Sequence, residues 1–409
     1  MCMVNTSGIM MPPAAGNARA AGGGARLQLM YSRHEWFQLR DAVAGCAGHG
    51  LFRGAVACAF NEAPECMDYL LPVIESDSFS RAARHAHDLL IWRYMRQGKF
   101  RSALAHIEPV MAGNLREQGR HILLKTLAQF PEQSLQRRHS CVLPYEMVDG
   151  SMFVPVQMNG TGADFMLDSG ATISMITRSM ARQMGLPIHA VPPEAARVYG
   201  ATGVESQFHI TVVAQLDIGE CRLSDVTFII LEDEHFQFPP AYAGALGLPV
   251  LIALETLAWN RKGECHLAFP AQTHDIKRAN ICFDGPEPLI NVAFRRQKLP
   301  MVFDTGNSAT IFGPEFLAMV PELTGNSEHK SSLLLRGISG NEEVASVCLP
   351  MVVLEVGGFR TSVKPAHVLL NTTTPNSNWS FGRLGLDCLN QAAKVTLDFH
   401  CMQLTLEDK

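Results

Sequence analysis

The sequence predicts a multidomain protein in which an α-helical region is followed by a bilobal all-β region. Apolar residues recur at helical spacing over residues 31–139, and short alternating strands begin at about residue 140. The strand region then repeats its own landmarks, which divides it into lobes at 140–275 and 276–409. The chain has 409 residues, of which 47% are apolar and 18% charged, enough for two or three globular domains.

Residues 1–30 are rich in Gly, Ala and Pro, so we expect a disordered tail or a mis-assigned start. This stretch has no basic start followed by a continuous apolar segment, so it gives no clear signal peptide. No apolar run elsewhere in the sequence is long enough to span a membrane.

The helical region is expected to contain a helix, a tight turn at Gly98 and a second helix. Its segment 89–107, "LLIWRYMRQGKFRSALAHI", resembles a tetratricopeptide repeat (TPR). The residues that match the packing positions of that repeat are Leu90, Tyr94, Gly98, Phe100 and Ala103. A TPR-like module would offer a groove for a peptide or a protein partner, whereas the alternative is a plain helical bundle.

The strand region alternates apolar and polar residues between turn signals, which is typical of an all-β sandwich or barrel. Asn159-Gly160 is a hairpin signal between two such strands. Three landmarks occur twice, in the same order and 136 to 138 residues apart. They are "FMLDSGATISMI" and "MVFDTGNSATIF", "YGATG" and "RGISG", and "GALGLPVL" and "GRLGLDCL".

Because of these motifs, the last two-thirds of the chain resembles the pepsin-like and retropepsin-like aspartic proteases. The two lobes look like two retropepsin subunits joined in one chain. The matching elements are Asp168-Ser169-Gly170 and Asp304-Thr305-Gly306, each after an apolar strand. Each lobe also carries the apolar-apolar-Gly element of that family late in its sequence. Arg383 departs from the family pattern, because it replaces one apolar residue of the second element.

The resemblance implies that Asp168 and Asp304 form a catalytic dyad that hydrolyses peptide bonds. Two carboxylates within hydrogen-bond reach share one proton, so one activates water while the other polarises the carbonyl group. This chemistry requires no metal, no cofactor and no covalent intermediate. The sequence leaves open which of the two carboxyl groups carries the proton.

The resemblance also assigns roles to the residues around the dyad. Ser169 and Thr305 would brace the two loops through hydrogen bonds to the opposite lobe, and Gly170 and Gly306 would allow their close approach. Glycine-rich hairpins would close over the substrate as flaps. The flap residues would be Tyr199, Gly200, Gly203, Gly337 and Gly340, and Arg336 in place of a second tyrosine implies unlike flaps.

We therefore interpret the protein as an aspartic endopeptidase that acts on a peptide or protein substrate. We expect a monomer because both lobes lie in one chain. The net charge of −5 and the lack of long Lys or Arg runs do not suggest a nucleic-acid partner. The alternative is a catalytically silent peptide-binding or scaffolding protein that uses the helical module. A protease recruited to one partner by its helices is compatible with the first interpretation. The family resemblance points to a bacterial protein, and the sequence leaves open whether it is periplasmic or cytoplasmic.

Overall fold

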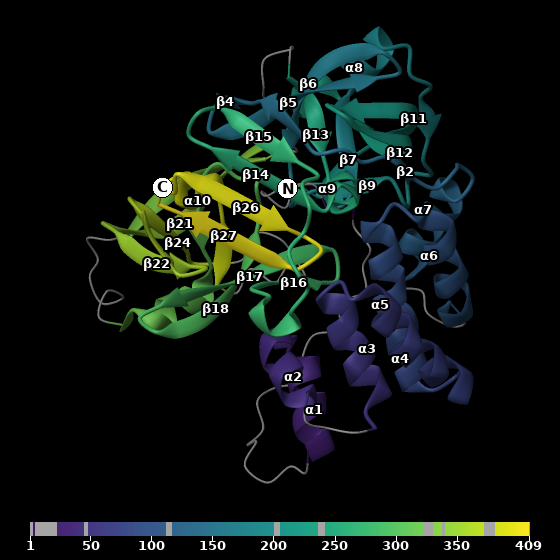
Figure 1. The fold of residues 1–409 in the computed structure, drawn as a ribbon, viewed down its shortest axis with the longest axis vertical. Helices are drawn as coiled ribbons and strands as arrows, with labels where there is room; N and C mark the ends of the chain where they lie inside the picture. Colours follow the sequence, from purple (N-terminus) through teal and green to yellow (C-terminus); the bar gives the residue numbers. More distant parts are fainter. Residues whose placement is uncertain are drawn as a thin grey trace.

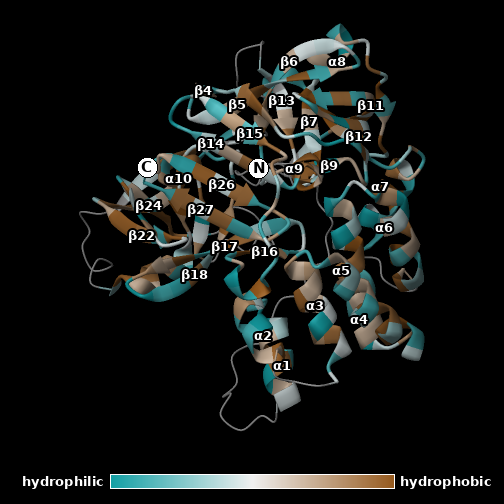
Figure 2. Ribbon diagram, viewed as in Figure 1, coloured by the Kyte–Doolittle hydropathy of each residue, from teal (hydrophilic) through white to brown (hydrophobic). Residues whose placement is uncertain are grey.

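The computed structural model describes residues 3–4, 23–44, 48–111, 117–199, 205–235, 242–321, 330–337, 340–371 and 381–408. Figure 1 shows the helices of the N-terminal region gathered beside a larger body of strands. The helices and strands carry both hydrophobic and hydrophilic residues (Figure 2). The predicted combination of a helical N-terminal region and a β-rich, barrel-like region is confirmed at this level.

The N-terminal region is built from short helices that pack in sequence order. They are α1 (Gly23–Ser32), α2 (Trp36–Val43), α3 (Gly50–Ala59), α4 (Ala63–Ser76), α5 (Arg81–Arg96), α6 (Phe100–Ile107) and α7 (Gln118–Leu127). The predicted turn lies between α5 and α6, where Gly98 has a φ of +68°, a conformation that glycine adopts without steric cost. The helical hairpin is therefore present, whereas its identity as a TPR repeat stays a prediction.

The predicted tail is too long, because α1 begins at Gly23 and buries Leu27. The sequence there is "GGARLQLMYS", in which the two glycines suggested a flexible segment. The apolar face that follows them gains more free energy by packing against the neighbouring helices than the low helix propensity of the two glycines costs. Tertiary contacts therefore decide the conformation of residues 23–30.

The first β region contains a nine-stranded sheet among the described residues, with the order β2-β12-β7-β13-β6-β5-β11-β8 and β4 paired with β5. Its strands are β2 (Ser134–Arg137), β4 (Glu146–Val148), β5 (Ser151–Met158), β6 (Thr161–Leu167), β7 (Ser174–Thr177), β8 (His189–Ala190), β11 (His209–Ile218), β12 (Cys221–Leu231) and β13 (Tyr242–Leu246). Helices α8 (Arg178–Gln183) and α9 (Leu248–Leu254) follow β7 and β13. Asn159 and Gly160 both have positive φ and join β5 to β6, as the hairpin signal predicts.

The second β region contains a ten-stranded sheet, again among the described residues, with the order β20-β21-β24-β19-β25-β18-β17-β22-β23 and β16 paired with β17. Its strands are β16 (Ile281–Asp284), β17 (Glu287–Phe294), β18 (Gln297–Phe303), β19 (Ile311–Phe312), β20 (Lys330–Gly337), β21 (Gly340–Leu349), β22 (Val352–Val356), β23 (Phe359–Val363), β24 (Ala366–Leu369) and β25 (Gly382–Leu384). Helix α10 (Leu386–Leu389) follows β25.

The two sheets use equivalent strand registers, as the internal repeat predicts. In the first, β6 pairs in parallel with β13 so that Met166 lies opposite Ala245. In the second, β18 pairs in parallel with β25 so that Val302 lies opposite Arg383. Since 136 residues separate Met166 from Val302 and 138 separate Ala245 from Arg383, the structural repeat follows the sequence repeat.

A third sheet joins the two halves, so they are not separated cleanly at residue 275. It has the order β27-β26-β14-β15-β3. Its strands are β3 (Cys141–Pro144), β14 (Thr256–Asn260), β15 (Glu264–Leu267), β26 (Lys394–Asp398) and β27 (Gln403–Glu407). The C-terminal strand β26 pairs with β14 of the first β region, which no local sequence pattern could indicate. The strand structure also starts earlier than predicted, at Ser134 of β2.

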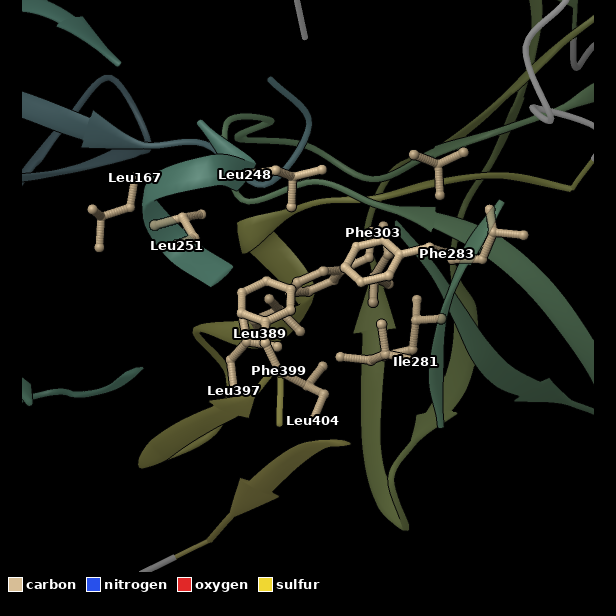
Figure 3. Close-up of a cluster of buried hydrophobic side chains, with 14 of the residues drawn as sticks. Leu167, Leu248, Leu251, Ile281, Phe283, Phe303, Leu389, Leu397, Phe399 and Leu404 are labelled. Atoms are coloured by element: carbon tan, nitrogen blue, oxygen red, sulfur yellow. The ribbon is translucent and has the colours of Figure 1, made fainter. Parts of the chain in front are cut away.

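One apolar core runs through both β regions and into the helices. Figure 3 shows buried apolar side chains from the two regions in one cluster, among them Leu167 at the end of β6 and Phe303 at the end of β18. The same buried cluster includes Trp36 and Phe60 of the helical region. This shared core fixes the ends of β6 and β18 rigidly where they meet.

Polar contacts also hold the helical region against the turn that joins β16 to β17. Arg96 of α5 is buried, donates hydrogen bonds to the carbonyl oxygens of Gly285 and Cys58, and places its guanidinium 4.4 Å from the centroid of the Phe283 ring. His34 lies 2.7 Å from the buried carboxylate of Asp284, which raises the pKa of the imidazole. The helices are therefore a structural part of the second β region.

Two remaining features of the described chain are the state of its cysteines and the hydrophobicity of its helices. Cys58 and Cys66 form a disulfide, and the free cysteines are Cys141, Cys221, Cys265, Cys282, Cys348, Cys388 and Cys401. Within the described ranges no helix is long and apolar enough to cross a membrane.

We predict that Arg96→Ala lowers the free energy of unfolding by about 2–4 kcal/mol, because it removes the hydrogen bonds to the carbonyl groups of Gly285 and Cys58 and a cation–π contact. Urea denaturation followed by circular dichroism measures this loss. Arg101→Ala on the exposed side of α6 is the control and should change stability by no more than about 0.5 kcal/mol. Equal stability of the two variants would contradict the docking role of Arg96.

Candidate active site

The two aspartates of the repeated motif emerge from equivalent strands and are both buried. Asp168 directly follows β6 and Asp304 directly follows β18, and each is 1% exposed. The Asp168 N–H donates to the carbonyl oxygen of Leu246 at 3.0 Å, and the Asp304 N–H donates to that of Leu384 at 3.2 Å. The parallel strands β13 and β25 thus hold the two aspartates in the same way.

Each carboxylate also accepts a hydrogen bond from the glycine of its own turn. Gly170 N–H donates to Asp168 Oδ1 at 2.8 Å, and Gly306 N–H donates to Asp304 Oδ1 at 2.9 Å. These bonds fix the orientation of both side chains and leave their second oxygens for other partners. The local geometry is therefore nearly twofold symmetric.

The two turns are tied to each other by reciprocal hydrogen bonds. Ser169 N–H donates to Thr305 Oγ1 at 2.9 Å, and Thr305 N–H donates to Ser169 Oγ at 3.0 Å. Each hydroxyl then donates across to the opposite strand, Ser169 Oγ to the carbonyl of Phe303 and Thr305 Oγ1 to the carbonyl of Leu167. All four bonds are buried, so the relative position of the turns is strongly determined.

The glycines of the motif are required because each lies against the carboxylate of the other turn. A Cβ atom on Gly170 would lie 2.5 Å from Asp304 Oδ1, and one on Gly306 would lie 2.5 Å from Asp168 Oδ1. No side chain fits in either place. The two carboxyl groups consequently share one small space between the turns.

The charges in this space are not symmetric. Burial and the neighbouring negative charge of Asp304 raise the pKa of Asp168 to about 7. Burial would also raise the pKa of Asp304, but the Arg383 guanidinium, with which its Oδ2 forms a buried ion pair, brings that pKa below its ordinary value. Near pH 5 the structure therefore favours a protonated Asp168 beside an ionised Asp304.

Two supporting residues were missed in the sequence analysis. Ser174 Oγ accepts a hydrogen bond from the Gly247 N–H at 2.9 Å, and Thr310 Oγ1 accepts one from the Gly385 N–H at 3.0 Å. Both hydroxyls lie six residues after an aspartate of the dyad. That common offset is the signal in the sequence that could have identified them.

The predicted flap residues fall partly within the described chain, at two antiparallel hairpins. Tyr199 ends β9 (Arg197–Tyr199), which pairs with β10 (Glu205–Gln207), while Gly200 and Gly203 lie outside the described residues. Gly337 and Gly340 face each other at the end of the β20–β21 hairpin. The described parts of both segments are hairpin strands, and their role as flaps stays a prediction.

The edge of β9 carries an additional strand from the beginning of the chain. Met3 and Val4 (β1) pair antiparallel with Tyr199 and Val198. The outer edge of β9 thus pairs with an extended backbone, which is the way in which many proteins bind peptides.

Features other than the dyad that could bind a ligand are cavities and metal-ligating clusters. A cavity of about 610 Å³ lined by Arg137, Asp164, Asp217 and Arg222, among others, contains none of the predicted site residues. Among the described residues, no group of three or more His, Cys, Asp and Glu side chains is arranged to hold a metal ion.

Comparison with known proteins gives a family match over part of the first β region. Residues 154–250, which include Asp168, match the family model described as "Aspartyl protease". No curated protein matches the chain in sequence. The second β region with Asp304 lies outside the family match, so its assignment depends on the internal repeat.

Structural neighbours of the chain include retropepsin-like and pepsin-like aspartic proteases. A retropepsin-like aspartic protease from Rickettsia conorii is 16% identical over 33% of this chain and 93% of that chain, with a TM-score of 0.23. The protein edgp is 10% identical over 66% of this chain and 94% of that chain, with a TM-score of 0.40. An aspartic proteinase from Irpex lacteus is 11% identical over 66% and 97%, with a TM-score of 0.37.

We predict that Thr305→Val destabilises the protein by about 2–4 kcal/mol, because the Ser169 N–H and the Leu167 carbonyl would both lose a buried partner. Thr305→Ser keeps the hydroxyl and should cost about 1 kcal/mol or less. Urea denaturation of both variants measures the difference. Similar losses for Val and Ser would show that the hydroxyl does not tie the turns together.

Proposed function

We propose that this protein is an aspartic endopeptidase with Asp168 and Asp304 as its catalytic dyad. The observation that carries the proposal is the crossing of the two Asp-Ser/Thr-Gly turns, in which each carboxylate lies against the glycine of the other turn. Two buried carboxyl groups so placed share one proton and titrate as a unit. The aspartyl protease match over residues 154–250 supports the same class of reaction.

The chemistry follows from the unequal charges of the dyad. Asp304 accepts a proton from a water molecule as the water oxygen forms a bond to the substrate carbonyl carbon, and Asp168 donates its proton to the carbonyl oxygen. The tetrahedral diol then collapses. The C–N bond breaks, the leaving nitrogen takes the proton from Asp304, and Asp168 regains its own proton as the new carboxylic acid forms.

The substrate would bind as an extended strand between the β9–β10 hairpin and the dyad. The pairing of β9 with Met3–Val4 supports this mode, because it shows that the hairpin edge accepts a backbone with strand geometry. Tyr199 at the end of β9 would then lie at the flap, and the proposal assigns Gly200 and Gly203 to the same flap. In the second β region Gly337 and Gly340 would have the equivalent place.

We predict that Asp168→Asn and Asp304→Asn each reduce kcat for peptide cleavage by at least about 10³-fold, because each removes one partner of the proton exchange. Cleavage of a fluorogenic peptide library measures the loss. Asp68→Asn on the exposed face of α4 is the matched control and should leave kcat unchanged. Undiminished cleavage by both dyad variants would refute the mechanism, and a wild-type protein that binds peptides without cleaving them would favour the scaffold alternative.

We predict that kcat/KM falls as the pH rises through about 7. The pKa of Asp168 is raised from 3.8 to about 7, so this carboxyl group is protonated below that pH and ionised above it. A dyad with two negative charges has no proton to give to the carbonyl oxygen. Initial rates between pH 3 and pH 9 test this, and a maximum above pH 8 would contradict the assignment.

A further inference from the structure

Arg383 occupies a position that is neutral in the first β region. It lies on β25 between Val302 of β18 and Ile311 of β19. Its counterpart Ala245 lies on β13 between Met166 of β6 and Met175 of β7. The structural repeat thus replaces a methyl group by a guanidinium group next to one aspartate only.

Glu287 shows the same one-sided replacement. It pairs with Asp284 at the start of β17, in the place that Ser151 has at the start of β5, where Ser151 pairs with Val148. The two substitutions meet in space, because Arg383 Nη2 lies 3.8 Å from Glu287 Oε1. The second β region has therefore gained a complementary pair of charges where the first has Ser151 and Ala245.

The three charged side chains form a buried row that ends at the dyad. Arg383 is 0% exposed, Glu287 is 4% exposed, and Arg383 Nη1 forms an ion pair with Asp304 Oδ2. A buried guanidinium group is stable only if anions compensate its charge. The charge of Arg383 therefore favours the ionised form of Asp304, and β13 supplies no equivalent cation to Asp168.

On the basis of the proposed function, we propose that Arg383, oriented by Glu287, is a positioning residue that keeps Asp304 ionised and leaves the shared proton on Asp168. The dyad would then enter catalysis with fixed roles, Asp304 as the base toward water and Asp168 as the acid toward the carbonyl oxygen. A symmetric dyad would distribute the proton between both carboxyl groups.

Other titratable groups are packed around this row, and two of them, Asp387 and Asp284, have partners of their own. Asp387 of α10 accepts hydrogen bonds from the Thr310 N–H at 2.8 Å and the Thr310 hydroxyl at 2.6 Å. Asp284 lies 2.7 Å from His34. His367 of β24 is in register with Ile311 and so lies on the same sheet face as Arg383, two strands or about 10 Å away. Arg383 is thus the cation that contacts Asp304 directly.

The first test compares the pH profile of peptide cleavage in Arg383→Met, Arg383→Lys and wild type. Without the cation, the acid limb of kcat/KM should move up by about one to three pH units, because Asp304 would protonate more readily. The Lys variant keeps the charge, so its acid limb should lie closer to that of the wild type. Arg120→Met is the matched control, since Arg120 is also buried and paired with Asp88 and Glu117, but in the helical region. Arg120→Met should lower stability without moving the acid limb of the kcat/KM profile.

The second test needs no activity and therefore separates this inference from the proposed function. Thermal unfolding is measured for wild type, Arg383→Met, Asp304→Asn and the double variant. If Arg383 acts on the charge of Asp304, the loss of Tm caused by Arg383→Met should be at least halved in the Asp304→Asn background. Additive losses of Tm, or an acid limb that Arg383→Met leaves in place, would overturn the inference. A wild type that cleaves no peptide would instead refute the proposed function, while the unfolding cycle still decides the role of Arg383.

Discussion

Two side-chain hydroxyls, those of Ser169 and Thr305, hold the two β regions together at the point where both aspartates emerge. Each accepts from the backbone of the opposite turn and donates to a carbonyl group of the opposite strand. Because these groups are buried, any shift between the regions would leave several of them without partners. The apolar residues before each aspartate, such as Leu167 and Phe303, anchor the strand ends in a shared core.

The sequence allowed prediction of the elements that obey local rules or repeat within the chain. Period-2 patterns located the strands, Asn159-Gly160 located a hairpin, and the doubled motif paired Asp168 with Asp304 before their contact was known. The C-terminal strand β26 could not be placed, since its partner β14 lies in the other half of the chain. Glu287 follows the turn sequence Asp-Gly-Pro, which indicates an exposed site, and only the fold buries it beside Arg383.

The helical region is linked to the site through one turn. Arg96 and His34 hold the residues between β16 and β17, and Glu287 begins β17 directly after that turn. Helices and strands also share one buried apolar cluster. Removal of the helices would therefore expose core residues and disturb the second β region. Substitutions on the exposed helix faces are the better way to examine recruitment of a substrate protein.

The central claim is that Asp168 and Asp304 share one proton and that Asp168 holds it. A crystal structure at atomic resolution, grown near pH 5, tests this most directly because carboxyl C–O bond lengths reveal protonation. We expect the nearest carboxyl oxygens to lie about 3 Å apart, with unequal C–O bonds in Asp168 and equal bonds in Asp304. A separation beyond hydrogen-bond reach would contradict the shared proton, and unequal bonds in Asp304 instead of Asp168 would contradict the assigned roles.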